Sequence, residues 1–346
     1  MSKNLRAKTI PSDWYTNEEI LKIEKKNIFL KSWQLFGSTD QLPDKGDYKI
    51  KSINGQPLIL IKNNNDSLNV FYNVCQHRGC VMIEGDGNAN SIKCGYHGWV
   101  YDLDGNLKTA RGFDKQTIKN KSLKLKSVDH YVWMNQIFVK LQKNANNIKK
   151  SLIKIEDIIY PTRFDDYSYH SRSTYKINCN WKVYMDNYLE GFHIPLVHPK
   201  LNSVIDYKSY STEIFDNFSL QWCHINAESS PYKKTDNDSK AYYFTLFPNI
   251  LLNIAPGRLQ TNVIEPITIS SCNVFFDYYF ENEEDLNSIQ EDISFSEKVQ
   301  IEDINICERI QIGLESDGFD HGIFSKKYET GVSHFQSYID KKINNG

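Results

Sequence analysis

Two short cysteine–histidine pairs constrain this chain more than any other feature. They are Cys75-x-His77 and, after sixteen intervening residues, Cys94-x-x-His97. Zinc fingers more often place two cysteines on one loop and two histidines on the other, although mixed zinc sites occur. An iron–sulfur cluster with two cysteines on one iron and two histidines on the other needs both ligand types on each loop. The spacing therefore favours a cluster, with a zinc-stabilised module as the alternative.

Composition excludes several other classes of protein. The 346 residues include seven cysteines, an odd number of which only three lie close together, and this is a poor disulfide framework. The 41 basic and 43 acidic side chains leave a net charge of −2, which gives no basic excess for nucleic acid or an anionic membrane. No stretch approaches the roughly 18 apolar residues of a membrane span, and the N-terminal segment lacks a signal-peptide pattern. These features predict a cytoplasmic protein that binds neither nucleic acid nor membrane.

The hydrophobic pattern predicts a helical arm followed by two domains. Residues 1–33 form the predicted arm, in which apolar positions recur at helical spacing from Trp14 to Trp33, and we expect this arm to pack on the second domain. Residues 34–142 contain short strands separated by hairpin signals such as Asn54-Gly55, typical of an all-β domain. A lysine- and asparagine-rich linker over 143–150 leads to the second domain, 151–346, so the predicted fold class is α+β. The elements expected in the second domain are a strand over 172–178, a helix over 181–193, several strands over 219–280 and a helix over 284–314.

The helix predicted over residues 181–193 carries acids and a histidine in one row. Asp186, Glu190 and His193 follow one another at spacings of four and three residues. His198 comes five residues later, and two nearby prolines interrupt the helix, so that a turn can bring His198 back toward His193. The row is a candidate metal-binding or proton-relay face, and a surface helix with a simple Glu–His contact is the alternative.

The long helix near the C-terminus has one acid in its apolar face. Asp303 shares that face with residues such as Val299 and Cys307, whereas Glu302 lies among polar residues and is predicted to be solvated. Burying an unpaired carboxylate is costly, so Asp303 needs a basic partner, a proton or a metal ion. Two histidines and one carboxylate form the facial triad of mononuclear non-haem iron(II). A salt bridge and a metal ligand are both open for Asp303.

Together these two groups of residues resemble the Rieske non-haem iron oxygenases. Arg78-Gly79 beside the first pair, and Gly95, Gly98 and Trp99 around the second, are similar to the loops of a Rieske iron–sulfur domain. The residues similar to the mononuclear-iron signature are Asn180-Trp181-Lys182, Asp186-Asn187, Glu190, His193, His198 and Glu302-Asp303. Glu190 stands where many ring-hydroxylating members have aspartate. This departure resembles the branch that acts on choline, carnitine and betaines.

The resemblance implies a set of site residues and an architecture. It implies an all-β Rieske domain beside a helix-grip catalytic domain, with α subunits in a head-to-tail ring, usually a trimer. The implied [2Fe-2S] ligands are Cys75, His77, Cys94 and His97, and the implied mononuclear iron ligands are His193, His198 and Asp303. Glu190 is implied as the bridge that carries electrons between centres of neighbouring subunits, with Asp186 as a supporting residue.

The implied activity is oxygen insertion into a small organic substrate. Dioxygen is activated with electrons that begin on NAD(P)H and arrive through a separate flavin- or ferredoxin-type reductase, since the chain lacks nucleotide-binding and plant-type ferredoxin motifs. A quaternary ammonium substrate is favoured, and hydroxylation of its N-methyl group would release formaldehyde. Strands around 244–253 and 262–266 are candidates for the pocket lining. The alternatives are an aromatic-ring hydroxylase and, from a different class, a non-catalytic Rieske electron carrier.

Overall fold

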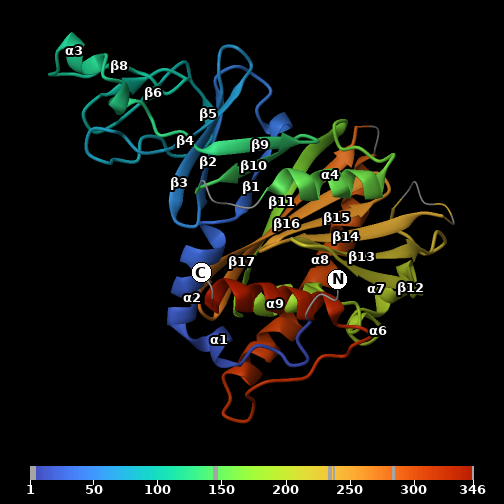
Figure 1. Cartoon of the computed structure of the whole chain (residues 1–346). Helices are drawn as coiled ribbons and strands as arrows, with labels where there is room; N and C mark the ends of the chain where they lie inside the picture. Colours follow the sequence, from blue (N-terminus) through green and yellow to red (C-terminus); the bar gives the residue numbers. More distant parts are fainter. Residues whose placement is uncertain (1–4, 143–146, 233–235, 237, 283–284, 345–346) are drawn as a thin grey trace. The chain divides into compact units, whose positions relative to one another are not determined.

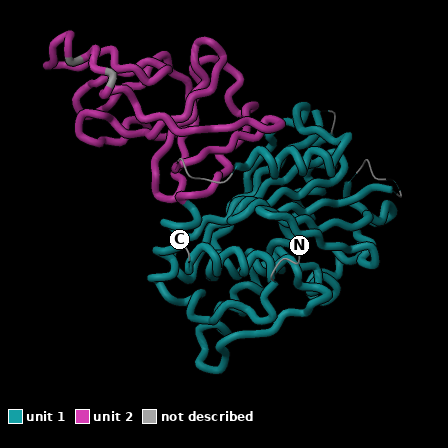
Figure 2. The backbone as a smooth tube through the Cα atoms, in the orientation of Figure 1, with its two compact units in different colours: residues 1–29, 147–346 teal, residues 30–146 magenta. Residues whose placement is uncertain are grey.

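The computed structural model describes residues 5–142, 147–232, 236, 238–282 and 285–344. The chain forms two compact units (Figure 2). The main unit consists of residues 1–29 and 147–346, and the insert consists of residues 30–146. The N-terminal residues thus belong to the same unit as the C-terminal half of the chain.

The insert is built on three small antiparallel sheets. Asn54 and Gly55 join two of its strands with φ values of 50° and 74°, the left-handed conformation that a tight hairpin turn requires. The insert also contains a short helix, α3 (Lys115–Ile118). The three sheets contain β1 (Trp33–Ser38), β10 (Gln136–Lys140) and β9 (Asp129–Trp133); β4 (Leu68–Tyr72), β3 (Gln56–Lys62), β2 (Asp47–Ile53) and β5 (Gly87–Asn88); and β6 (Ile92–Lys93), β7 (Val100–Tyr101) and β8 (Leu107–Thr109).

A seven-stranded antiparallel sheet forms the centre of the main unit (Figure 1). Six strands follow one another as hairpins, and β11 pairs with the last of them, so the order is β11-β17-β16-β15-β14-β13-β12. β15 is buried along its whole length, whereas the edge strand β11 alternates between more and less exposed positions. The strands span Tyr167–Ile177 (β11), Ile205–Ile214 (β12), Phe218–Ile225 (β13), Lys240–Leu246 (β14), Ile250–Ala255 (β15), Arg258–Thr268 (β16) and Ser271–Glu281 (β17).

Helices pack with this sheet around a large hydrophobic core, and a second cluster includes Ile194, Val204 and Phe295. Trp181 lies edge-on to Phe29 and Phe335, with ring centroids 4.9 and 5.8 Å away, so three segments distant in sequence share the core. The helices are α1 (Asp13–Thr16), α2 (Glu18–Glu24), α4 (Ile148–Ile159), α5 (Trp181–Tyr188), α6 (Ile194–Val197), α7 (Pro199–Val204), α8 (Leu286–Leu314) and α9 (Thr330–Asn344). Among the described residues, no helix combines the length and apolar character needed to cross a membrane.

A buried ion pair ties the N-terminal arm to α5. Lys182 Nζ lies 2.7 Å from Glu24 Oε1, and both side chains are fully buried. Two further hydrogen bonds compensate the loss of water: Trp181 Nε1 donates to Glu24 at 2.8 Å, and Lys182 Nζ donates to Asn180 Oδ1 at 2.9 Å. The arm is therefore held by matched charges as well as by apolar packing.

The α+β fold class is confirmed, and the structure differs from expectation in some elements. The helical turns of the arm end at Phe29, and β1 already begins at Trp33. Within the predicted linker, residues 143–146 lie outside the described residues, and α4 begins at Ile148. The lysines at 149 and 150 form the exposed face of α4, because Ile148, Leu152, Ile155 and Ile159 turn its other face inward.

Candidate active site

Two loops of the insert present the predicted cluster ligands in matching turns. Cys75 follows β4, and Cys94 lies between β6 and β7. In each loop the cysteine N–H donates to the carbonyl five residues later at 2.8 Å. Gly79 and Gly98 donate back to the two cysteine carbonyls at 3.0 and 3.1 Å, and both have the positive φ that favours glycine. One backbone turn is thus used twice, once for Cys-x-His and once for Cys-x-x-His.

The four side chains fit a [2Fe-2S] cluster. Cys75 and Cys94 are buried, and the rings of His77 and His97 lie with their centroids 4.6 Å apart. His77 Nδ1 is buried without a hydrogen-bond partner, which is costly for a polar atom unless it serves as a ligand. The Tyr101 hydroxyl lies 3.6 Å from Cys75 Sγ, and hydrogen bonds to sulfur tune the potential of such clusters.

The helix predicted over 181–193 is wrong beyond Tyr188, where α5 ends. The chain turns through Gly191, which lies so close to the Tyr210 ring that a Cβ there would approach ring atoms to 2.5 Å. The close approach to this ring requires glycine at the turn, and the turn moves His193 out of a continuous helix. Pro195 then lies in the first turn of α6, as expected for a helix that starts anew.

Glu190 uses this turn to orient His193. Glu190 Oε2 accepts the backbone N–H groups of Phe192 and His193, the latter at 3.1 Å. Glu190 Oε1 lies 2.5 Å from His193 Nδ1, which donates to it. Since Nδ1 carries the proton, Nε2 of His193 is left to bind a metal ion.

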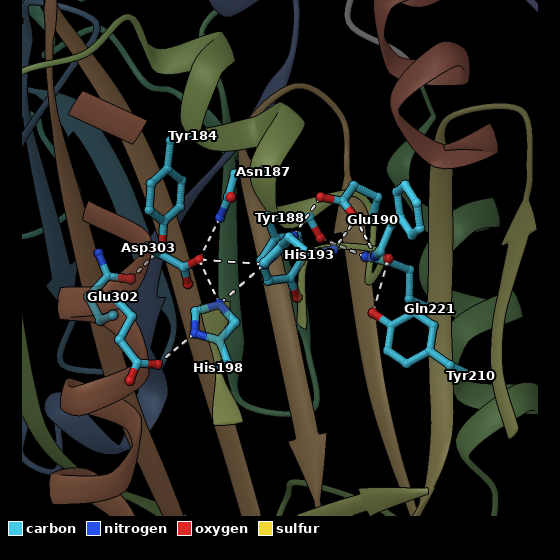
Figure 3. Close-up of polar contacts among 12 residues, drawn as sticks. Tyr184, Asn187, Tyr188, Glu190, His193, His198, Tyr210, Gln221, Glu302 and Asp303 are labelled. Carbon is cyan, nitrogen blue, oxygen red and sulfur yellow. Dashed lines mark hydrogen bonds and ion pairs between the residues drawn. The ribbon is translucent and has the colours of Figure 1, made fainter. Parts of the chain in front are cut away.

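His193, His198 and Asp303 converge on one point between the α6–α7 corner and α8 (Figure 3). The two histidine Nε2 atoms lie 3.2 Å apart, and Asp303 Oδ1 lies 3.0 Å from His198 Nε2 and 3.7 Å from His193 Nε2. Ligand atoms about 2.1 Å from one ion at right angles would be separated by about 3.0 Å. The donor set and spacing therefore fit a mononuclear iron with open positions.

Two neighbouring side chains orient this triad. Asn187 donates to Asp303 Oδ1 at 2.6 Å, and Glu302 Oε2 lies 2.7 Å from His198 Nδ1. Burial lowers the pKa of His198, but the hydrogen bonds and charges of Asp303 and Glu302 outweigh burial and raise it. The site thus favours a cation. The prediction that Glu302 is only solvated is wrong. Glu302 contacts Nδ1 of the His198 ring, whereas Asp303, the next residue on α8, contacts Nε2 of the same ring.

Asp186 lies apart from the triad. Its Oδ2 accepts hydrogen bonds from the Tyr15 hydroxyl at 2.5 Å and Gln336 Nε2 at 2.9 Å, and its Oδ1 is buried. Burial raises the pKa of Asp186 to about 7, although these hydrogen bonds and the charge of Lys182 act in the opposite direction. The row of Asp186, Glu190 and His193 predicted on one helix is therefore broken, because α5 turns Asp186 toward the arm.

We expect Asp186→Asn to change the pH dependence of stability. The folded pKa near 7 exceeds the ordinary value of 3.8, so the unfolded chain releases this proton first. The free energy of unfolding of the wild type should therefore fall by up to a few kcal/mol between about pH 4 and pH 7. Asp186→Asn removes this loss and gains stability relative to the wild type as pH rises. Melting curves at pH 5 and pH 8 check this, and Asp317→Asn, a change of an exposed acid, is the control. If the melting temperatures of Asp186→Asn and of the wild type changed equally with pH, the prediction would be contradicted.

A cavity of about 120 Å³ lies beside the triad. The two segments expected to line the pocket, 244–253 and 262–266, each contribute one residue to its wall, Asn253 and Asn262. Phe244 is buried elsewhere and does not line the cavity. Most of the aromatic lining was not predicted from the strand pattern, since it comes from several separate elements. The cavity is lined by five tyrosines: Tyr184, Tyr188, Tyr210, Tyr232 and Tyr243.

Comparisons with known proteins agree with this geometry. The family model "Ring hydroxylating alpha subunit (catalytic domain)" matches residues 164–345, and "Rieske [2Fe-2S] domain" matches residues 32–128. The chloroplastic choline monooxygenase of Arabidopsis thaliana is 31% identical, over 98% of this chain and 83% of that protein. The carnitine monooxygenase oxygenase subunit of Escherichia coli K12 is 30% identical, over 96% and 93%.

Solved structures show the same architecture. The quaternary ammonium Rieske monooxygenase CntA in complex with L-carnitine superposes with a TM-score of 0.84 at 26% identity, over 97% of this chain and 96% of that one. A naphthalene 1,2-dioxygenase superposes with a TM-score of 0.79 at 18% identity, over 100% and 95%, which shows a shared fold.

The chain belongs to the Rieske non-haem iron oxygenases, as a catalytic α subunit. Within that family it falls in the branch that contains choline and carnitine monooxygenases. It is an oxidoreductase, and its two family matches imply a [2Fe-2S] cluster and a mononuclear iron. This membership excludes the non-catalytic electron carrier and the zinc-stabilised module.

Proposed function

We propose that this chain hydroxylates a C–H bond on or beside the ammonium group of a small quaternary ammonium compound. The observation that carries the proposal is the tyrosine-lined cavity next to the histidine–carboxylate triad. Aromatic rings attract a quaternary ammonium through their π faces, and this attraction is strongest when both are removed from water. Relatives named for choline and carnitine support the same substrate class. The aromatic-ring hydroxylases share the fold and are the alternative within the family.

In this proposal Cys75, His77, Cys94 and His97 hold the [2Fe-2S] cluster, and His193, His198 and Asp303 hold iron. The iron, when bound, supplies the dioxygen chemistry, with one oxygen atom entering the substrate and the other leaving as water. The side chains around it have separate tasks. Glu190 and Glu302 keep the Nδ1 protons of the two histidines in place, and Asn187 keeps the Asp303 carboxylate turned toward them.

Electrons would cross between copies of the chain in a head-to-tail trimer, with Glu190 as the bridge. Each centre has exposed apolar residues beside it, which are typical of an interface. Tyr96 is 61% exposed next to His97 in the cluster loop, and Leu196 is 88% exposed in α6, close to His193. We propose that these two surfaces meet in neighbouring subunits. A separate reductase would supply the electrons, as the name "oxygenase subunit" implies for the carnitine relative.

Oxygen consumption by the purified enzyme tests this function. The enzyme, given a reductase or a chemical reductant, should consume oxygen faster with choline, carnitine or a betaine than without substrate. Formaldehyde in equal amount to oxygen would place the hydroxylation on an N-methyl group, and its absence would place it on a neighbouring carbon. Stimulation by aromatic acids alone would overturn the proposal.

A further inference from the structure

The charges in the substrate cavity distinguish between two kinds of quaternary ammonium compound. One kind has a single positive charge, as in choline, and the other is a zwitterion with a carboxylate, as in betaines. A carboxylate in a cavity with little water needs a cationic partner. Among the described residues that line the cavity, Arg258 on β16 is the one lysine or arginine.

Arg258 is already neutralised by the protein itself. Its Nη1 lies 2.6 Å from Asp292 Oδ1 on α8, and their side chains are only 7% and 6% exposed. Nη1 also donates to the Tyr232 hydroxyl at 3.3 Å, and Nη2 donates to Gln260 Oε1. Nε of Arg258 has no hydrogen-bond partner among the residues that the structure describes, so what a substrate carboxylate meets here is an N–H whose positive charge Asp292 already compensates.

A row of neutral groups continues from Arg258 along the cavity wall. Gln260 donates to Asn262 Oδ1 at 2.7 Å, and the Ser296 hydroxyl donates to Gln260 Oε1 at 2.9 Å. Gln260, Asn262 and Ser296 all line the cavity. This wall is therefore polar without offering a free positive charge.

Two of the tyrosines add neutral hydroxyl groups that already donate hydrogen bonds within the protein. Tyr188 donates to Asn253 Oδ1 at 2.9 Å. Tyr210 donates to Gln221 Oε1 at 3.1 Å (Figure 3). Burial raises the pKa of both phenols well above the usual value, so they stay uncharged. Uncharged rings suit a cation without opposing it.

Gln300 offers the cavity a neutral donor that has no partner among the described residues. Gln300 lies one turn before Asp303 on α8, and its Oε1 accepts the Tyr184 hydroxyl at 2.7 Å. Its Nε2 is buried and has no hydrogen-bond partner, although the residue lines the cavity. An amide N–H of this kind suits a neutral oxygen such as a hydroxyl, because no charge has to be compensated.

We propose that this cavity selects a quaternary ammonium compound with a neutral hydroxyl over one with a carboxylate, and that the Arg258–Asp292 pair sets this preference. The proposal rests on the proposed function and narrows it. Asp292 acts as a negative charge built into the protein that takes the place of a substrate carboxylate. Gln300 provides the hydrogen bond for the hydroxyl.

The test compares choline with glycine betaine, which share a trimethylammonium group and differ at the other end of the molecule. For the wild-type holoenzyme, kcat/KM from oxygen consumption should be at least about tenfold higher for choline. Protection against thermal unfolding by each compound gives a second readout that does not depend on turnover. Equal or better use of glycine betaine would overturn the inference. If neither compound, nor any other quaternary ammonium, raises oxygen consumption, the proposed function itself fails.

Variants of the ion pair test its role. Asp292→Asn frees the guanidinium and should reduce the preference for choline by at least about tenfold. The double variant Arg258→Gln with Asp292→Asn is neutral, avoids an unpaired buried charge and should keep the preference. Glu19→Gln, which removes an acid from an exposed ion pair on α2, is the matched control. An unchanged choline-to-betaine ratio in folded Asp292→Asn would contradict the role of Asp292.

A variant of Gln300 tests the hydrogen bond to the hydroxyl. Gln300→Leu should raise KM for choline several-fold and change KM little for propyltrimethylammonium, which has the same shape without the hydroxyl. Equal changes for both compounds would indicate a packing effect and overturn the assignment of Gln300.

Discussion

Asp303→Ala is expected to carry about two irons per chain instead of about three, with the cluster intact. Asp303 supplies the one carboxylate of the triad, and its Oδ1 lies within 3.0 Å of His198 Nε2. Loss of a residue that only orients a ligand typically costs 10–100-fold in metal affinity or activity, so loss of the ligand itself should cost more than about 1,000-fold in turnover. Iron analysis, the absorption spectrum of the cluster and oxygen consumption together check this.

Two further variants on α8 provide comparisons for the loss expected in Asp303→Ala. Glu302→Gln keeps the triad and weakens the contact with His198 Nδ1, so we expect an intermediate loss of about 10–100-fold in iron affinity. Glu291→Ala removes an exposed acid from the same helix and should behave as the wild type. If Asp303→Ala kept its full iron content and turnover, the assignment of Asp303 as an iron ligand would be contradicted.

Glu190→Gln is expected to retain both metal centres and yet lose oxygen-coupled turnover by about 100-fold or more. The amide can still accept one hydrogen bond from His193 Nδ1, so iron should remain bound. It lacks the negative charge and the second carboxylate oxygen that a cluster histidine of a neighbouring subunit would need. Single-turnover experiments that follow reoxidation of the reduced cluster measure the loss directly.

The matched control for this variant is Glu228→Gln, an exposed residue outside the cavity lining. Rapid cluster reoxidation in Glu190→Gln, with both centres loaded, would show that the electron path does not need this carboxylate. Slow reoxidation with iron lost would instead assign Glu190 to metal binding alone.

Much of the fold, and the family, could be predicted from the spacing of residues close together in the sequence. The two cysteine–histidine pairs and the Asn54-Gly55 turn lie within short stretches of chain, so their patterns predict structure directly. The break in the helix after Tyr188 could not be read in this way. It depends on the contact between Gly191 and the Tyr210 ring, which comes from a strand later in the chain.

The roles of single acids were harder to predict because helical faces do not reveal their neighbours. Asp186 and Glu190 are four residues apart, yet one contacts the arm and the other contacts His193. Glu302 has polar neighbours in sequence, but its partner His198 lies 104 residues away. The cluster ligands, the iron ligands and the bridging role of Glu190 stay predictions that the variants above test.

The triad also has a consequence for the lifetime of the protein. His198 and Asp303 lie 105 residues apart in the sequence, so a bound ion joins the α6–α7 corner to α8 and closes a long stretch of chain. Binding to the folded state alone stabilises it by mass action. Chelation should therefore make the main unit easier to unfold and to digest with protease. Under iron starvation, the amount of enzyme in a cell would fall together with its activity.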